Sequence, residues 1–75
     1  MDNHDRNTIL ISFGGNLRLT RLAADFTQEQ LANELGIKIS QISRIERGVI
    51  NTSFTTLYSI SKVLNVDIAE FFDFD

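Results

Sequence analysis

Apolar residues recur at helical spacing along most of this 75-residue chain. From about Thr8 to Asp25 they fall three or four positions apart, which indicates one buried helical face; a start near Asn16 is the alternative. Gly14 and Gly15 interrupt the pattern, and each lowers helix stability by roughly 1 kcal/mol relative to alanine. The predicted buried face consists of Leu10, Phe13, Leu17, Arg21 and Ala24.

Capping signals delimit four further helices. Thr27 and Gln30 form the pattern of a capping box, in which two side chains satisfy two otherwise unpaired amides. Glycine or asparagine with a positive φ commonly ends a helix. We therefore expect an all-α, compact five-helix bundle that forms a single domain over residues 1–75. The later helices are predicted from Thr27 to Gly36, from about Ile39 to Arg47 before Gly48, from Phe54 to Leu64 between Ser53 and Asn65, and over residues 68–72 after Asp67.

The second and third predicted helices, joined through Gly36, form a helix-turn-helix unit. Ala32 is small enough to let the two helices cross closely. The apolar residues expected between this pair and the bundle are Leu31, Leu35, Ile37, Ile42 and Ile45. The side chains left outside on the third helix and its ends are Lys38, Ser40, Gln41, Ser43, Arg44 and Arg47.

This outward set suits the major groove of DNA. Arg44 can bind a guanine edge through two hydrogen bonds, and Gln41 can do the same for adenine. Ser40 is short enough to allow close approach, whereas Ile39 either touches a thymine methyl or folds back into the core. The alternative interpretation is an ordinary solvated helix face, because polar residues at this spacing are common on helices.

The overall charge opposes this interpretation and its distribution supports it. The net charge of −3 and pI of about 4.9 are unusual for a nucleic-acid-binding domain. Residues 36–48, however, contain Lys38, Arg44 and Arg47 against one acid, Glu46. Residues 67–75 contain four acids and no base. Because DNA responds to the local face, the acidity weakens the DNA hypothesis without excluding it.

These segments resemble the Cro/lambda-repressor-type helix-turn-helix regulators, also called the XRE family. The segments TQEQLA, LGI, ISRIERG and SFTTLYSISKVLNV follow the family order within residues 17–66. The resemblance implies a lambda-repressor-like, five-helix DNA-binding domain that regulates transcription as a homodimer on two-fold symmetric operators. Restriction–modification controller proteins are the small members nearest in size, and phage Cro-like repressors and antitoxins are alternatives.

The resemblance also implies roles for individual residues. Arg21 and Glu46 match an ion pair that joins the first helix to the third. Relatives often have a Ser or Thr cap where Lys38 stands and a polar residue where Ile39 stands, so the pattern of base contacts departs from the family's. The implied base contacts are Ile39, Ser40, Gln41 and Arg44; the implied DNA-backbone contacts are Thr27, Gln28, Lys38, Ser43, Arg47, Asn51 and Thr52.

Three phenylalanines crowd the last five residues, and one helix face cannot bury them all. We assign Phe71 to the core and the others to an association surface, because exposed aromatic clusters mark such surfaces. A two-fold dimer formed there would set two recognition helices about 34 Å apart. The predicted dimer interface is Tyr58, Lys62, Ile68, Phe72 and Phe74.

The sequence offers little for other classes of function. The chain has no cysteine, and its sole histidine, His4, lies beside Asp2 and Asp5 in what we expect to be an N-terminal tail. We therefore expect no metal, no cofactor, no small-molecule ligand and no enzymatic activity. No apolar run approaches the roughly 18 residues of a membrane span, so we expect a cytoplasmic protein without membrane association.

Two questions about partners stay open at this point. An activator would also need a surface for RNA polymerase, for which Glu29 and Glu34 are the candidates. The competing hypothesis is a protein-interaction module that keeps the fold and has lost DNA binding. It is favoured by the acidic pI, by Ile39 on the outward face and by the aromatic C-terminal segment.

Overall fold

The computed structural model describes residues 3–74, with side chains from Asp5 onward. This part of the chain contains helices and no strand. The predicted all-α fold is thus present, but the fifth element is a 3-10 helix of five residues rather than an α-helix. A segment this short is typical of the tighter 3-10 hydrogen-bond pattern. The elements are α1 (Asn3–Ala23), α2 (Gln28–Leu35), α3 (Ile39–Glu46), α4 (Phe54–Leu64) and η1 (Ile68–Phe72).

The predicted helix caps are confirmed. Thr27 Oγ1 accepts a hydrogen bond from the Gln30 amide at 3.0 Å, and Gln30 Oε1 accepts one from the Thr27 amide at 2.9 Å. Gly36 ends α2 with a φ of 70°, and Asn65 ends α4 with a φ of 58°. Ser53 Oγ accepts a hydrogen bond from the Thr56 amide at 3.2 Å. Local sequence therefore sets where α2 and α4 begin and end.

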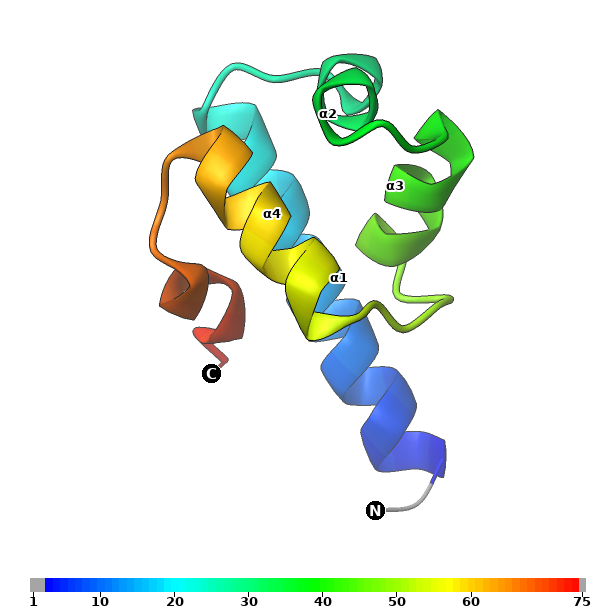
Figure 1. The fold of residues 1–75 in the computed structure, drawn as a ribbon. Coiled ribbons are helices and arrows are strands. Elements are labelled where there is room, and N and C mark those ends of the chain that lie inside the picture. Colours follow the sequence, from blue (N-terminus) through cyan, green and yellow to red (C-terminus); the bar gives the residue numbers. More distant parts are fainter. Residues whose placement is uncertain (1–2, 75) are drawn as a thin grey trace.

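The helices enclose one core. α1 packs against α3 on one side and against η1 on the other, and α2 packs against α3 and α4 (Figure 1). Side chains from all five elements meet in the centre, which explains how short helices are stabilised. Its largest fully buried members are Leu17, Leu31, Ile42, Ile45, Ile60 and Phe71.

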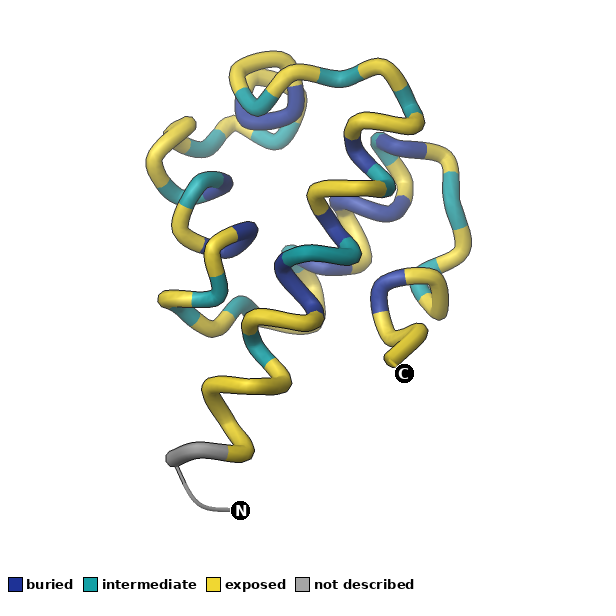
Figure 2. Tube along the Cα trace, turned by 180° about the vertical axis from the view of Figure 1, so that it is seen from behind, coloured by how far each residue is buried: buried dark blue, intermediate teal, exposed yellow. Residues whose placement is uncertain are grey.

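Helix α1 is longer than predicted. It begins at Asn3, so both expected starts, Thr8 and Asn16, are wrong. Residues 5–9 are all exposed, and Figure 2 shows these first turns leaving the packed body of the protein. Because no side chain there is buried, apolar periodicity could not reveal that the helix starts so early.

Two glycines allow α1 to approach α3 and the turn after it. A Cβ on Gly14 would lie 2.5 Å from the carbonyl oxygens of Ile45 and Glu46. A Cβ on Gly48, which has a φ of 75°, would lie 2.7 Å from the Cα and amide nitrogen of Ile11. These contacts are between backbones, so the position of α3 relative to α1 is closely defined.

Candidate nucleic-acid interface

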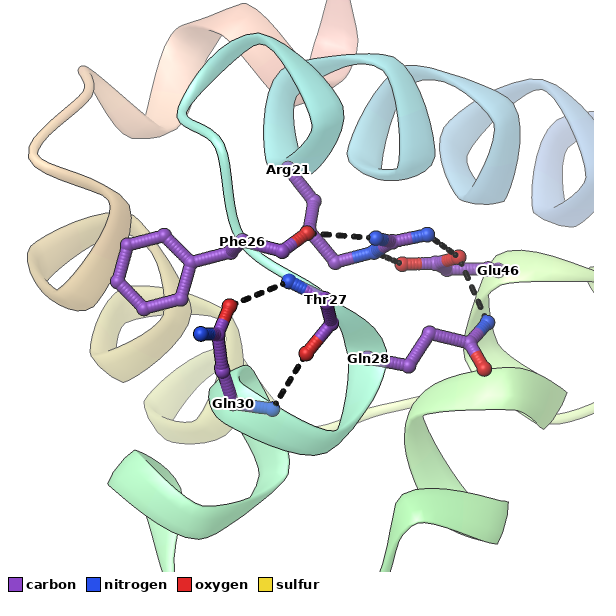
Figure 3. Close-up of polar contacts among 6 residues, drawn as sticks. All are labelled: Arg21, Phe26, Thr27, Gln28, Gln30 and Glu46. Atoms are coloured by element: carbon purple, nitrogen blue, oxygen red, sulfur yellow. Dashed lines mark hydrogen bonds and ion pairs between the residues drawn. The ribbon is translucent and has the colours of Figure 1, made fainter.

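A buried ion pair supports α3 from behind. Arg21 Nε on α1 donates to Glu46 Oε2 at 2.6 Å, and Arg21 Nη2 donates to Glu46 Oε1 at 3.0 Å (Figure 3). Arg21 Nη1 also donates to the carbonyl oxygen of Phe26 at 2.7 Å. The structure therefore brings together the two residues for which the family resemblance implies an ion pair. A charge-assisted pair with two parallel hydrogen bonds defines orientation as well as distance.

Gln28 extends this network to α2. Its Nε2 donates to Glu46 Oε1 at 3.0 Å, so one carboxylate joins α1, α2 and α3 (Figure 3). The resemblance assigns Gln28 to a DNA phosphate, and here its side chain has a partner inside the protein. The Gln28 side chain can therefore bind DNA only with atoms that this hydrogen bond leaves available, or after the bond to Glu46 breaks.

The opposite side of α3 faces outward. Ile39 is 47% exposed, so it belongs to the outward face and not to the core. Ser40 and Arg44 are exposed, and Gln41 is half-buried. Glu46, the one acidic residue of α3, is buried against Arg21. Apart from Ile39, the exposed surface of α3 is therefore polar and cationic, as the sequence predicted.

Most of the candidate backbone contacts lie at the start of α2 or beside the two ends of α3, and Ser43 lies within α3. Thr27 and Gln28 line a surface hollow together with Ile39, the first residue of α3. Arg47 follows α3 and is exposed, and Asn51 accepts a hydrogen bond at its Oδ1 from the Thr52 amide at 2.9 Å. The remaining two candidates are Lys38, which is exposed directly before α3, and Ser43, which is half-buried within it.

The predicted dimer residues separate into two groups. Phe72 and Phe74 are 48% and 42% exposed, and their ring centroids lie 6.3 Å apart. Tyr58 is also exposed, with Lys62 Nζ 5.4 Å from its ring centroid. Ile68, in contrast, is half-buried and packs against the core.

The structure adds two residues to the phenylalanine pair. Ile9 and Phe54 line a groove with Phe72 and Phe74, and Phe54 is 70% exposed. We call the surface of these four residues the apolar groove. Sequence reasoning missed Ile9 because the first turns of α1 have no buried stripe. It treated Phe54 only as the first residue of a helix, and no local pattern shows that this exposed ring lies beside the C-terminal phenylalanines.

Within residues 3–74, no helix combines the length and the apolar character that a membrane crossing requires. The described side chains contain no group of three metal-ligating residues placed to share an ion. Asp2, Asp75 and the side chain of His4, which the sequence placed near the chain ends, lie outside the described part. The backbone of His4 belongs to α1.

Several known proteins resemble this one. Control protein C.BamHI from Bacillus amyloliquefaciens is 39% identical over 69 residues, which cover 91% of this chain and 85% of that protein. The crystal structure of the restriction-modification controller protein C.AhdI from Aeromonas hydrophila superposes with a TM-score of 0.78 at 32% identity. That match covers 83% of this chain and 94% of C.AhdI. The clp gene regulator ClgR from Corynebacterium glutamicum gives a TM-score of 0.81 at 25% identity, covering 85% of this chain and 68% of ClgR.

Longer proteins contain the same unit. Uncharacterized HTH-type transcriptional regulators from Sinorhizobium medicae and Rhizobium meliloti are 37% identical over 67 residues. The match covers 89% of this chain but only 48% of each relative, so the chain spans about half their length. A family model described as helix-turn-helix matches residues 17–71, from α1 to η1. The chain therefore belongs to the XRE-type helix-turn-helix family of DNA-binding transcriptional regulators.

Proposed function

We propose that this protein regulates transcription by binding two-fold symmetric operator DNA as a homodimer, with α3 in the major groove. The observation that carries the proposal is the charge arrangement around α3. Its outward face has exposed Arg44 and is followed by exposed Arg47, while its single acid is buried against Arg21. The surface that DNA would meet is thus cationic although the whole chain has a charge of −3.

The base-reading roles follow from side-chain chemistry. Arg44 binds guanine O6 and N7 through its two-pronged guanidinium, and Gln41 binds adenine N6 and N7. Exposed Ser40 adds a short hydroxyl near the start of α3, and exposed Ile39 contacts a thymine methyl. Because α3 is held from behind at Glu46, these side chains are presented in a defined orientation.

The backbone-binding roles use groups at the start of α2, within α3 and in the loop after it. The first amides of α2 and its dipole bind one phosphate next to Thr27 and Gln28. Arg47 with Asn51 and Thr52 binds another on the far side of the groove. Lys38 and Ser43 add contacts along α3 itself. Phosphate contacts on both sides set the register in which Arg44 and Gln41 meet the bases.

The homodimer forms through the exposed aromatic end of the molecule. Phe72, Phe74 and Tyr58 are all exposed in the single chain, and the apolar groove enlarges this surface with Ile9 and Phe54. A two-fold dimer buries the same patch on both subunits, which matches the two-fold symmetry of an operator. The likeness to C.BamHI and C.AhdI supports a controller-type regulator.

The test is selection of bound sites from a random DNA pool, followed by affinity measurements at rising salt. We expect selected sites with two-fold symmetry and half-sites about one DNA turn apart. The affinity should fall steeply with salt, because each neutralised phosphate contributes about 0.9 to the logarithmic slope. Near-absent binding at low salt would contradict the proposal and favour the protein-interaction alternative.

Variants of Arg44 test the reading face within the same assay. Arg44→Ala should relax preference at one or two base positions, by about 1–3 kcal/mol. Arg44→Lys is the matched control, since it keeps the charge and loses the planar fork. It should keep most non-specific affinity and still lose base preference. An unchanged preference profile in Arg44→Ala would contradict the role assigned to this residue.

A further inference from the structure

Two arginines from distant parts of the sequence line one shallow hollow on the surface. Arg6 comes from the first turn of α1, and Arg47 follows the last residue of α3. Both side chains are exposed. Asn7, Asn51, Ile11 and Val49 are also among its lining residues. In Figure 1 the first turns of α1 extend past the loop that follows α3.

A close backbone contact fixes the two segments that form the hollow. Ile11 and Gly48 meet backbone to backbone, and a side chain at Gly48 would collide with Ile11. Arg6 lies little more than one helical turn before Ile11, so α1 holds it in a defined position beside the turn. Because α1 begins at Asn3 and not near Thr8, Arg6 belongs to this helix and lines the same hollow as Arg47.

The chemistry of the lining suits an oxyanion. Two guanidinium groups offer planar sets of N–H donors that match phosphate oxygens. The Oδ1 of Asn51 accepts a hydrogen bond from the Thr52 amide, and the NH2 group of Asn51 is the part of this side chain that can donate to an anion. Among the described residues that line the hollow, none is acidic, although Asp5 is adjacent to Arg6 in sequence.

We propose that this hollow binds a phosphate of the DNA backbone and so adds the N-terminal end of α1 to the DNA interface. The inference rests on the proposed function, because Arg47 immediately follows the helix that enters the groove. A phosphate held between Arg6 and Arg47 belongs to the strand that flanks the groove beyond the end of α3. The contact increases affinity without reading sequence.

The first test compares the salt dependence of operator binding by the full chain and by Arg6→Gln. Glutamine removes the charge and is as good a helix former as arginine, so α1 is preserved. We expect the magnitude of the logarithmic salt slope to fall by about 0.9 per bound protomer. Affinity at moderate salt should fall about tenfold per protomer, with an unchanged base-preference profile. Arg6→Lys is the control and should restore most of the slope.

A second test locates the contact on DNA. Ethylation of one phosphate per half-site should weaken binding by the wild type and have little effect on Arg6→Gln. Identical slopes and identical interference patterns for the two proteins would overturn the inference. In that case a wild type with a steep salt slope would leave the proposed function standing. A wild type without a salt slope would instead contradict the proposed function itself.

Inorganic phosphate distinguishes a free anion from the DNA backbone as the source of the phosphate. We expect millimolar phosphate to shift the NMR signals of the Arg6 and Arg47 side chains only weakly, and the shifts to be larger with operator DNA. Tight binding of phosphate in the absence of DNA, together with an unchanged salt slope in Arg6→Gln, would overturn the assignment to DNA.

Discussion

The outward face of α3 and the apolar groove differ in how the fold supports them. The face of α3 lies over the buried pair of Arg21 and Glu46 and over the backbone contact at Gly14. The apolar groove is assembled from the ends of elements, namely the first turns of α1, the first residue of α4 and the end of η1.

This difference matches the two tasks that we propose for these surfaces. Reading bases requires side chains whose orientation is set in advance, because hydrogen bonds to base edges tolerate little displacement. Association through apolar surface is less directional, since the hydrophobic effect scales with the area removed from water. We infer that the chain concentrates its buried polar contacts behind α3 and leaves its exposed aromatic rings at the other surface.

The largest expected effect comes from removing the support behind α3. Glu46→Ala should lower the free energy of unfolding by about 3–5 kcal/mol, because it leaves the buried Arg21 without its carboxylate. It also removes the acceptor of the Gln28 amide. Urea unfolding measures the loss. The control Glu34→Ala, at an exposed position of α2, should change stability by no more than about 0.5 kcal/mol. Equal losses in both variants would contradict the structural role of Glu46.

An intermediate effect should come from the two adjacent glycines of α1, with opposite signs. Gly14→Ala should destabilise by about 1–3 kcal/mol, because its Cβ would press on the carbonyl oxygens of α3. Gly15→Ala should stabilise by about 0.5–1 kcal/mol, since a Cβ there meets no described atom within 4 Å beyond its own helical backbone and sequence neighbours. Thermal unfolding separates the two. If both variants shift stability in the same direction, the close approach of α1 to α3 is wrong.

The third expected effect is on association and hardly on folding, and it concerns the apolar groove. Phe54→Ser should raise the dissociation constant of the dimer about tenfold and leave stability nearly unchanged, because Phe54 is 70% exposed. Sedimentation velocity over a concentration series measures the change. Leu19→Ser is the matched control, since Leu19 is 64% exposed and lines a different hollow on α1. A wild type that stays monomeric at high micromolar concentration, or equal effects in both variants, would remove the groove from the interface.

Sequence reasoning succeeded where the signal is local. Thr27 and Gln30 bond to each other across three residues, and Gly36 needs only its own left-handed conformation. The outward and inward sides of α3 also followed from periodicity within eight residues. The same reasoning could not decide whether Ile39 faces outward or packs in the core, and the fold leaves it exposed.

Most of what the sequence did not predict involves contacts between distant segments. From the sequence, Gly14 only lowers the stability of α1. In the fold, a glycine is needed there because the carbonyl oxygens of α3, more than 30 positions later, leave no room for a Cβ. The long N-terminal part of α1 has no buried stripe, so no pattern marks its start. Neither the hollow shared by Arg6 and Arg47 nor the groove shared by Ile9 and Phe74 exists until the ends of the chain are folded together.

The sequence by itself thus determined the helix-turn-helix unit, its caps and its cationic outward face, because these depend on hydrogen bonds and periodicities that span a few residues. Only the tertiary structure decided how far α1 extends, why it needs a glycine opposite α3 and which exposed side chains share a surface. Those outcomes depend on packing between segments far apart in the chain, where the shape of the partner, and not the local pattern, selects the arrangement.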